Sequence, residues 1–355
     1  MFTRNDTKKT YVGGVPIGGG SPVVIESMTN TDTRDVAATI RQIHLLEAAG
    51  CEIVRLAVLD SEAALALREI KAEINIPMIA DIHFDYKLAL AAVKSGVDKL
   101  RINPGNIGAG SNVREVAEAA KVAGIPIRVG VNAGSISRAD RDKYGGVTPE
   151  AMAESAFYDI DLLEKHNFDN IVISLKASNL PLMLEANKIV AGRVNYPLHI
   201  GLTESGTPVN GAIRSAAALG SMLILGLGDT IRVSLSGDPV EEIKAAKLIL
   251  SAMGLREFGV RVIACPTCGR TTMDVPKIAE MVEKFTENIK KPLTVAVMGC
   301  VVNGPGEARE ADIGMAGADS GNAAIYKDDK VIARGPVAEM QEFLLNEIQK
   351  MAEEE

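Results

Sequence analysis

The stretch Glu52-Ile53-Val54-Arg55-Leu56-Ala57-Val58 shows the pattern that decides the fold. It is a short, mostly apolar run rich in β-branched residues, which is typical of a buried strand, and a segment with helical spacing follows it. The same unit recurs along most of the chain. Eight strand candidates share it: residues 23–29, 52–58, 77–84, 99–103, 126–132, 170–177, 197–204 and 229–236.

The segments between these strands carry helix signals. Thr148-Pro149 and Asp238-Pro239 each place a capping side chain before a proline suited to a first helical turn, and Gly50 is suited to end a helix. Apolar strands that alternate with helices predict a parallel sheet covered by helices. Eight such units in roughly 250 residues predict a closed (β/α)8 TIM barrel, because this is its usual length.

Five cations interrupt the apolar strands, each in a different strand: Arg55, Arg101, Arg128, Lys176 and Arg232. Facing the helix layer would strip these charges of water, so we expect them to point into the barrel, at the carboxyl-terminal mouth where barrel enzymes build their sites. Each could form an internal ion pair, but the mouth carboxylates Asp81 and Glu204 are too few to pair with all of them. The sequence therefore favours a ligand with several negative charges, such as a diphosphate.

A linker is expected at residues 254–259, which begin and end with glycine. It would separate a substrate-binding barrel domain, residues 1–254, from a small α/β domain, residues 259–355. In the second domain we expect strands at 260–264 and 293–298, a short strand near Ile313, a hairpin that turns at Asp328-Asp329, and helices with apolar faces between and after them.

Three of the four cysteines lie in this second domain, Cys265 and Cys268 in one turn and Cys300 on a later Gly/Pro-rich loop. All histidines precede them, which weakens a zinc site, and a dithiol redox pair would not need Cys300. Glu307 is the oxygen ligand best placed to complete the set. Three thiolates and one exchangeable carboxylate favour an iron-sulfur cluster, with structural zinc and a disulfide switch as the alternatives.

Two further features are expected to be structural. Cys51 follows Gly50 at the start of a strand, so we expect a buried small side chain far from the mouth. The glycine-rich segment 11–21 precedes a strand and does not open a helix. It therefore predicts a hairpin under the barrel and not a phosphate-binding loop.

Composition narrows the function classes. The formal net charge of -8 and the sequence pI near 5.3 argue against a nucleic-acid-binding protein, which usually carries a broad basic face. The amino terminus has no apolar stretch, and no run reaches the roughly 18 apolar residues that a membrane span needs. We expect a cytoplasmic protein whose few cysteines serve as reduced metal ligands.

Several motifs together resemble the family of the 4-hydroxy-3-methylbut-2-enyl diphosphate synthases, in its two-domain bacterial form. They are the glycine segment 11–21 that leads into Glu26-Ser27-Met28-Thr29-Asn30-Thr31, then Ala80-Asp81-Ile82-His83, Leu100-Arg101-Ile102-Asn103-Pro104-Gly105-Asn106, Gly201-Leu202-Thr203-Glu204, Cys265-Pro266-Thr267-Cys268-Gly269-Arg270 and Gly299-Cys300-Val301-Val302-Asn303-Gly304-Pro305-Gly306-Glu307. The resemblance extends over essentially the whole chain.

The resemblance implies an iron-sulfur oxidoreductase of the methylerythritol phosphate route to isoprenoids. It would open and dehydrate 2-C-methyl-D-erythritol 2,4-cyclodiphosphate to 4-hydroxy-3-methylbut-2-enyl diphosphate, with electrons from a flavodoxin or ferredoxin. A homodimer is implied, in which the small domain of one subunit caps the barrel of the other.

The resemblance also implies roles for individual residues. A 4Fe-4S cluster would be held by Cys265, Cys268, Cys300 and Glu307. Glu204 would act as an acid/base, and Glu307 would take part in catalysis as the exchangeable ligand. The substrate would be bound by Arg55, Arg101, Arg128, Asn132, Lys176, Arg232 and Ser234, and by Asn303 beside the cluster.

Two other interpretations use parts of the same pattern. A pterin-binding TIM-barrel enzyme with a metal module would explain the barrel and an anionic substrate, but not Glu307 or the three cysteines. An iron or redox sensor would use the cysteines and leave the cationic mouth without a purpose.

Overall fold

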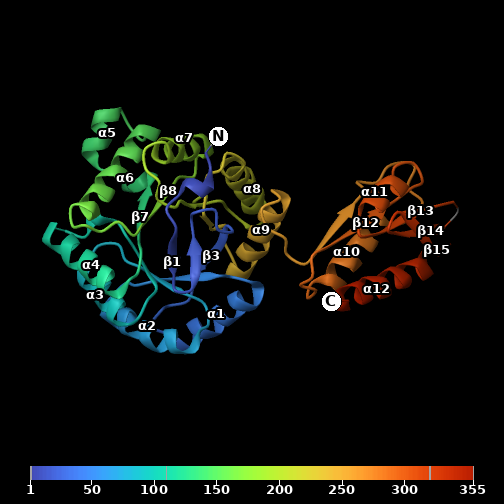
Figure 1. Ribbon diagram of the computed structural model, residues 1–355, viewed down its shortest axis with the longest axis horizontal. Helices are drawn as coiled ribbons and strands as arrows, with labels where there is room; N and C mark the ends of the chain where they lie inside the picture. Colours follow the sequence, from blue (N-terminus) through green and yellow to red (C-terminus); the bar gives the residue numbers. More distant parts are fainter. Residues whose placement is uncertain (1, 109, 320, 355) are drawn as a thin grey trace. The chain divides into compact units, whose positions relative to one another are not determined.

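The computed structural model describes residues 2–108, 110–319 and 321–354. The chain forms two compact units, Met1–Arg256 and Glu257–Glu355 (Figure 1). The division falls within the segment 254–259 that the sequence indicated as a linker. Each unit has its own sheet and its own hydrophobic core.

The first unit is a parallel barrel, as predicted. Its strands follow one another around the sheet in the order β8-β7-β6-β5-β4-β3-β10-β9, and a parallel bridge between Ile173 and Leu198 joins the two ends. The strands are β3 (Val24–Met28), β4 (Ile53–Ala57), β5 (Met78–Asp81), β6 (Lys99–Ile102), β7 (Ile127–Asn132), β8 (Ile171–Lys176), β9 (His199–Ile200) and β10 (Thr230–Ile231).

Helices surround this barrel in Figure 1. They are α1 (Val36–Ala49), α2 (Ser61–Glu73), α3 (Tyr86–Lys94), α4 (Gly110–Ala123), α5 (Arg138–Tyr144), α6 (Pro149–Glu164), α7 (Leu180–Ala191), α8 (Pro208–Ile224) and α9 (Pro239–Ala252), with short 3-10 turns η1 (Arg4–Asp6), η2 (Pro104–Asn106) and η3 (Ala133–Ser135).

The predicted helix signals are confirmed. Thr148 caps α6 by accepting from the Ala151 amide at 3.2 Å, and Asp238 caps α9 by accepting from the Val240 amide at 2.9 Å. Helix α1 ends at Gly50, whose φ of 98° lies in the left-handed region that glycine adopts without strain. Local capping chemistry therefore sets these helix ends.

The last two barrel strands are shorter than predicted. β9 and β10 contain two residues each, whereas the sequence indicated residues 197–204 and 229–236. Beyond β10 the backbone bonds to side chains and loops: the Leu235 amide donates to Glu242 at 3.1 Å, and the Ser236 amide donates to the Gly206 carbonyl at 2.9 Å. The ladder ends early because these contacts replace a neighbouring strand.

A hairpin packs on the inner core near the beginning of the strands, as the glycine-rich segment predicted. Strands β1 (Thr10–Val12) and β2 (Val15–Ile17) pair antiparallel. Their buried side chains join inward-facing barrel residues in a single apolar cluster made up of Val12, Ile17, Val24, Ile53, Ile79 and Val172. This apolar floor leaves the polar interior to the opposite, carboxyl-terminal end of the strands.

The second unit is a small mixed sheet with helices. Its strand order is β11-β12-β13-β14-β15, in which the first three strands run parallel and the last two pair antiparallel. The strands are β11 (Val260–Ala264), β12 (Leu293–Met298), β13 (Ile313–Gly317), β14 (Asn322–Lys327) and β15 (Lys330–Pro336), and the helices are α10 (Val275–Thr286), α11 (Gly304–Glu310) and α12 (Val337–Glu353).

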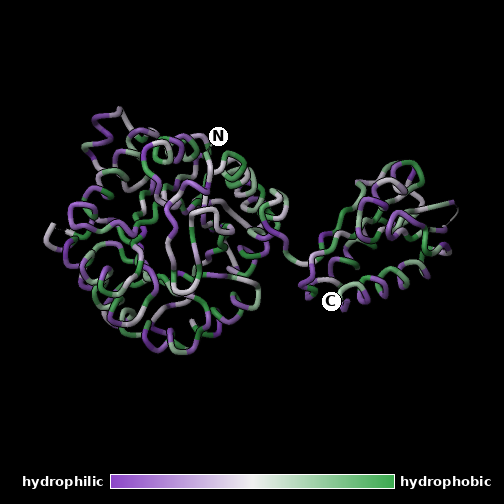
Figure 2. Tube along the Cα trace, viewed as in Figure 1, coloured by the Kyte–Doolittle hydropathy of each residue, from purple (hydrophilic) through white to green (hydrophobic). Residues whose placement is uncertain are grey.

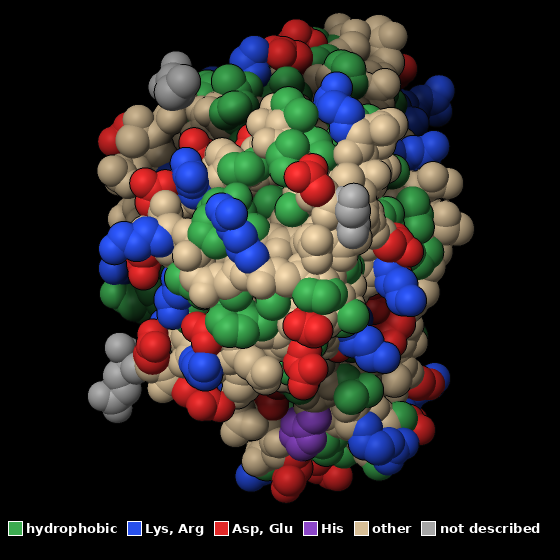
Figure 3. Space-filling model, turned by 90° about the vertical axis from the view of Figure 1, so that its right-hand side faces the viewer, with side chains coloured by type: hydrophobic (Ala, Val, Ile, Leu, Met, Phe, Trp, Pro, Cys, Tyr) green, Lys and Arg blue, Asp and Glu red, His purple; other side chains and the backbone are tan. Residues whose placement is uncertain are grey.

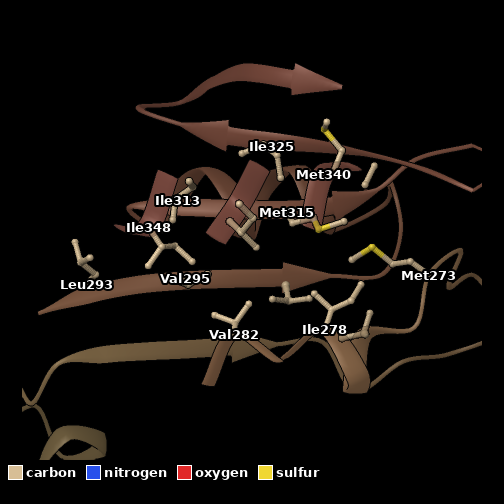
Figure 4. Close-up of a cluster of buried hydrophobic side chains, with 14 of the residues drawn as sticks. Met273, Ile278, Val282, Leu293, Val295, Ile313, Met315, Ile325, Met340 and Ile348 are labelled. Carbon is tan, nitrogen blue, oxygen red and sulfur yellow. The ribbon is translucent and has the colours of Figure 1, made fainter. Parts of the chain in front are cut away.

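The core of the second unit lies between its sheet and the helices α10 and α12. Figure 4 shows side chains from both helices and from the strands pointing toward one another, among them Val282, Val295 and Ile348. Hydrophobic and hydrophilic positions alternate along α12 in Figure 2, as expected for a helix with one buried face. The helical spacing that places Ile278 and Val282 on one apolar face of α10 also predicts Phe285 there, but the Phe285 side chain is 41% exposed.

Two surface features bear on the function classes that the composition narrows. Among the described residues, no helix is both long enough and apolar enough to cross a membrane. On the face shown in Figure 3, basic and acidic side chains are interspersed. That face lacks the broad basic patch of a nucleic-acid-binding surface.

Candidate functional site

A buried carboxylate organises the interior of the barrel. Both oxygens of Glu26, on β3, accept from Arg128 Nη1 at 2.6 Å, and Lys99 Nζ lies 3.4 Å from Oε2. His199 Nδ1 lies 3.7 Å from the same oxygen. All four side chains come from different strands and are essentially inaccessible to solvent. The barrel therefore contains a closed ionic layer directly above its apolar floor.

Charge and burial set the ionisation of this layer. Burial raises the pKa of Glu26, but the neighbouring cations, Arg128 first among them, outweigh it and hold the pKa well below its usual value. Burial lowers the pKa of Lys99 to about 7, against the attraction of Glu26. Burial and the nearby Arg128 also keep the pKa of His199 well below normal, so this imidazole is neutral. Glu26 and Arg128 form the ionised pair at the centre.

A second carboxylate lies nearer the mouth. Asp81, at the end of β5, lies 3.2 Å from Arg101 Nη1 and 3.7 Å from Arg55 Nε. Burial raises the pKa of Asp81, but the charges of Arg55 and Arg101 prevail and hold it below the usual range. Asp81 therefore remains ionised and orients two of the predicted cations.

The third carboxylate comes from the helix layer. Glu242 on α9 accepts from Arg232 Nε at 3.1 Å and from Nη2 at 3.2 Å, and it also accepts from the Ser27 hydroxyl at 2.9 Å. Its side chain is 3% exposed. A bidentate arginine-carboxylate pair fixes the plane of the guanidinium, so Glu242 determines how Arg232 faces the mouth.

Sequence reasoning missed three of these residues. Glu26 is a charged residue within an apolar strand. The pattern that identified the five cations could therefore have identified it too. Lys99 stands at the first position of its strand, where a lysine is ordinarily solvated. Glu242 lies in the acidic first turn of α9, where a carboxylate needs no functional explanation.

Two predicted residues lie elsewhere than expected. Arg128 is fully buried against Glu26, below the mouth. Glu204 is solvent-exposed and, among the described residues, forms no ion pair with the mouth cations, so it is not the counter-ion that the sequence suggested. Its φ of 56° lies in the left-handed region, a strained conformation for a residue with a side chain. Asn132, the last residue of β7, and Ser234, three residues beyond β10, are half-buried.

A glycine makes room for one of the cations. A Cβ atom built on Gly130, in β7, would lie 2.5 Å from Arg101 Nε and 2.8 Å from Nη2. Any side chain at this position must displace the guanidinium. The neighbouring strand therefore determines where Arg101 can lie.

Gly130→Ala is expected to weaken the binding of inorganic pyrophosphate by about tenfold, since a displaced arginine loses much of a charge-assisted contact. Calorimetric titration measures the change. Gly134→Ala is the matched control at the same end of the barrel, because a Cβ there meets nothing within 4 Å. Equal affinity in the two variants would exclude Arg101 from the anion site.

The cysteines of the second unit lie on two loops that are hydrogen-bonded to each other. The Gly299 amide donates to Cys265 Sγ at 3.2 Å, and the Gly299 carbonyl accepts from the Thr272 amide at 2.9 Å. Thr267, between Cys265 and Cys268, is β-branched and has a φ of 62°, a rare conformation that shapes this turn. The loops after β11 and β12 therefore form one structure.

The thiols are free and differ in character. Cys265 and Cys300 are half-buried, Cys268 is exposed, and none is in a disulfide. Hydrogen bonds from the Val302 and Asn303 amides, and the nearby Arg270, lower the pKa of the Cys300 thiol. A depressed pKa favours the thiolate, the form that binds metals. Cys51 is the contrast: it is buried as predicted, and burial raises its pKa to about 12.

The predicted ligands are not all gathered at metal-binding distance. Within the described parts of the chain, no three His, Cys, Asp or Glu side chains lie close enough together to hold a metal ion. Glu307, in the first turn of α11, and Asn303, before that helix, are both exposed. The donor set still fits a thiophilic metal group, since free thiols lie on two connected loops and one is biased toward the thiolate.

Family models match both units. The model of the GcpE TIM-barrel domain matches residues 7–247, and that of the GcpE protein C-terminal domain matches residues 261–350. A solved dihydropteroate synthase from Stenotrophomonas maltophilia superposes with a TM-score of 0.50 at 15% identity, over 69% of this chain and 98% of that one. This likeness concerns the fold alone.

Curated relatives match along their whole length. One from Caldanaerobacter subterraneus subsp. tengcongensis is 55% identical over 99% of both chains. Another, from Ruminiclostridium cellulolyticum, is 52% identical over 98% of both chains. Both are named 4-hydroxy-3-methylbut-2-en-1-yl diphosphate synthase (flavodoxin). With both units matched and more than half of the residues identical to one such relative, this chain belongs to the GcpE family of 4-hydroxy-3-methylbut-2-en-1-yl diphosphate synthases.

Proposed function

We propose that this chain is an oxidoreductase that converts 2-C-methyl-D-erythritol 2,4-cyclodiphosphate to 4-hydroxy-3-methylbut-2-enyl diphosphate, in the methylerythritol phosphate pathway of isoprenoid biosynthesis. The reaction opens the ring, removes one oxygen as water and consumes two electrons. Family membership supports this function, since relatives that match the whole chain carry the name of this activity. A flavodoxin is the proposed electron donor, because their names include it, with a ferredoxin as the alternative.

The observation that carries the proposal is the cationic interior of the barrel. Among the described residues, three carboxylates, Glu26, Asp81 and Glu242, face six basic side chains: Arg55, Lys99, Arg101, Arg128, Lys176 and Arg232. With Lys99 and Lys176 both neutral, four arginines still face three carboxylates, so positive charge is in excess. A diphosphate supplies the missing negative charge, and arginines bind its oxygens through paired donors.

We propose that residues 1–254 bind this substrate. Arg55, Arg101 and Arg232, which are held in place by Asp81 and Glu242, would contact its phosphates. Asn132, Lys176 and Ser234 would complete the site, with Arg128 as its deepest cation. The exposed Glu204 would donate or accept a proton near the reacting carbons, and its strained backbone supports a functional role, since such strain persists where the surrounding structure enforces it.

We propose that residues 259–355 hold a 4Fe-4S cluster through Cys265, Cys268, Cys300 and Glu307, with Asn303 beside it. When bound, the cluster supplies single electrons and a Lewis-acidic iron. Glu307 is the exchangeable ligand, because a carboxylate holds a thiophilic iron less firmly than a thiolate does. The three thiols fix the metal group to the loops after β11 and β12, and the Val302 and Asn303 amides stabilise negative charge at Cys300.

The assembly and location are also proposals. A homodimer follows from the resemblance, and its mass in solution tests it directly. A cytoplasmic location suits reduced cysteines and a small soluble electron donor. The comparisons do not favour the pterin-binding alternative: the likeness to dihydropteroate synthase is limited to the fold, whereas the named synthases match both units. The sensor alternative leaves the cationic barrel without a ligand.

The decisive experiment uses the full-length protein purified without oxygen. Iron and acid-labile sulfide are expected at about four each per chain, with the spectrum of a 4Fe-4S cluster. Reduced flavodoxin and the cyclodiphosphate should then yield the linear diphosphate. A fully loaded protein that leaves the cyclodiphosphate unchanged under these conditions would overturn the function.

A further inference from the structure

Lys176 differs from the other cations of the barrel in its surroundings. It is the last residue of β8, and it lies beside Asn132 of β7 in the parallel register. The residue is buried. Gly201 leaves room for its amine, since a Cβ there would stand 3.1 Å from Lys176 Nζ and 2.5 Å from the Arg232 carbonyl oxygen. The lysine thus reaches into the interior at the level of the mouth.

Each neighbouring arginine has a carboxylate partner. Arg128 is bound to Glu26, Arg55 and Arg101 flank Asp81, and Arg232 is bound to Glu242. Among the residues that the structure describes, Lys176 Nζ forms neither a hydrogen bond nor an ion pair. Lys176 is therefore a basic residue of the mouth that no described carboxylate holds in place.

The groups around Lys176 disfavour a charge on its amine. Arg55 on β4, Arg128 on β7 and Arg232 after β10 repel an ammonium, while Glu26 on β3 attracts it less strongly than the three arginines together repel it. His199 on β9 is neutral and supplies no charge. Burial is the largest cause, because the loss of hydration also favours the neutral amine.

We propose that Lys176 is a neutral amine in the free protein and takes up one proton from solvent when a phosphorylated ligand enters the barrel mouth. A phosphate among these groups reverses the balance, because it brings negative charge to an amine that no described carboxylate holds. The proton binds to Nζ, and the resulting ammonium donates to a phosphate oxygen. This inference rests on the proposed anion site and adds that ligand binding there is coupled to protonation.

The coupling keeps the free barrel stable. A permanently charged group at this position would be a buried cation with no partner, which folded proteins tolerate poorly. A lysine avoids that cost by releasing its proton, whereas an arginine cannot. The residue type at position 176 therefore matches a site that is empty for part of each catalytic cycle.

Calorimetry in buffers with different heats of ionisation counts the protons exchanged on binding. The probe is inorganic pyrophosphate, and the full-length, anaerobically purified protein is compared with Lys176→Arg, whose guanidinium is always charged. Any proton that pyrophosphate itself gains or loses on binding is the same for both proteins, so it cancels in the comparison. The wild type is expected to take up about one proton more per bound pyrophosphate than Lys176→Arg.

The pH dependence gives a second measurement. Raising the pH removes the proton that binding requires, so the wild-type Kd should rise relative to that of Lys176→Arg by up to about tenfold per pH unit. This pH dependence is expected at pH values above the lowered pKa of the free Lys176 amine and below the higher pKa of the ligand-bound ammonium. Lys165→Arg, at an exposed lysine beyond α6, is the matched control and should behave as the wild type does.

Lys176→Met is a second variant, which tests the proposal if the arginine of Lys176→Arg does not fit in the barrel. It keeps a similar stem without a titratable group, so the extra proton should disappear and binding should weaken. An equal proton count in wild type, Lys176→Arg and Lys176→Met overturns the proposal while leaving the anion site intact. A wild-type protein that does not bind pyrophosphate overturns the anion site itself, and the coupling with it.

Discussion

Cys300→Ser is expected to abolish turnover and to remove most of the iron from the purified protein. Cys300 is one of three thiols on the two connected loops, and its thiolate is stabilised by the Val302 and Asn303 amides. A serine alkoxide is a much poorer ligand for a thiophilic metal. Two thiols and a carboxylate are then too few to retain a cluster. Iron and sulfide content, the cluster spectrum and turnover with reduced flavodoxin measure the loss.

The fold of the variant should survive. The buried cluster of Met273, Ile278, Val295 and their neighbours does not include Cys300. Circular dichroism should therefore be unchanged. Cys51→Ser is the matched control, because this thiol is buried in the first unit and contacts the Ile53 carbonyl, which a hydroxyl can also do. A Cys300→Ser protein with full iron content would show that the ligand assignment is wrong.

Glu26→Ala is expected to destabilise the barrel by about 3–5 kcal/mol, the usual cost of leaving one member of a buried ion pair alone. Arg128 would lose its hydrogen bonds to both oxygens of Glu26. An arginine side chain does not release its proton in a protein, so the guanidinium would remain charged and unpaired. Lys99 can respond differently, since its pKa is already lowered to about 7 and would fall further, leaving a neutral amine. The unpaired guanidinium therefore accounts for most of the loss.

Denaturant unfolding of the full-length protein measures this change, with the two units followed as separate transitions because each has its own core. The second unit should unfold as in the wild type. Glu185→Ala removes an exposed carboxylate paired with Lys188 one helical turn away, and it should cost at most about 1 kcal/mol. If Glu26→Ala costs no more than this control, the buried layer does not hold the barrel together.

Much of the architecture could be predicted because its signals are local. Alternation of apolar strands with capped helices indicated the barrel, and Thr148 and Asp238 cap the helices that they were expected to cap. In the second unit the sequence placed β11 and β12 at the bounds that the structure shows. Short-range periodicity and capping depend on neighbours within a few residues, so one sequence suffices to read them.

The sequence by itself determined the strand and helix order, the presence of cations within the barrel strands and the three-cysteine pattern. Only the tertiary structure decided which carboxylate meets which cation: Glu26 and Arg128 are 102 residues apart, and Glu242 reaches Arg232 from the helix layer. It also decided that Gly130 leaves the space for Arg101 and that no carboxylate of the described residues pairs with Lys176. Closure of the barrel brings distant strands face to face, and pairing energies within it depend on burial and distance, which no local pattern encodes.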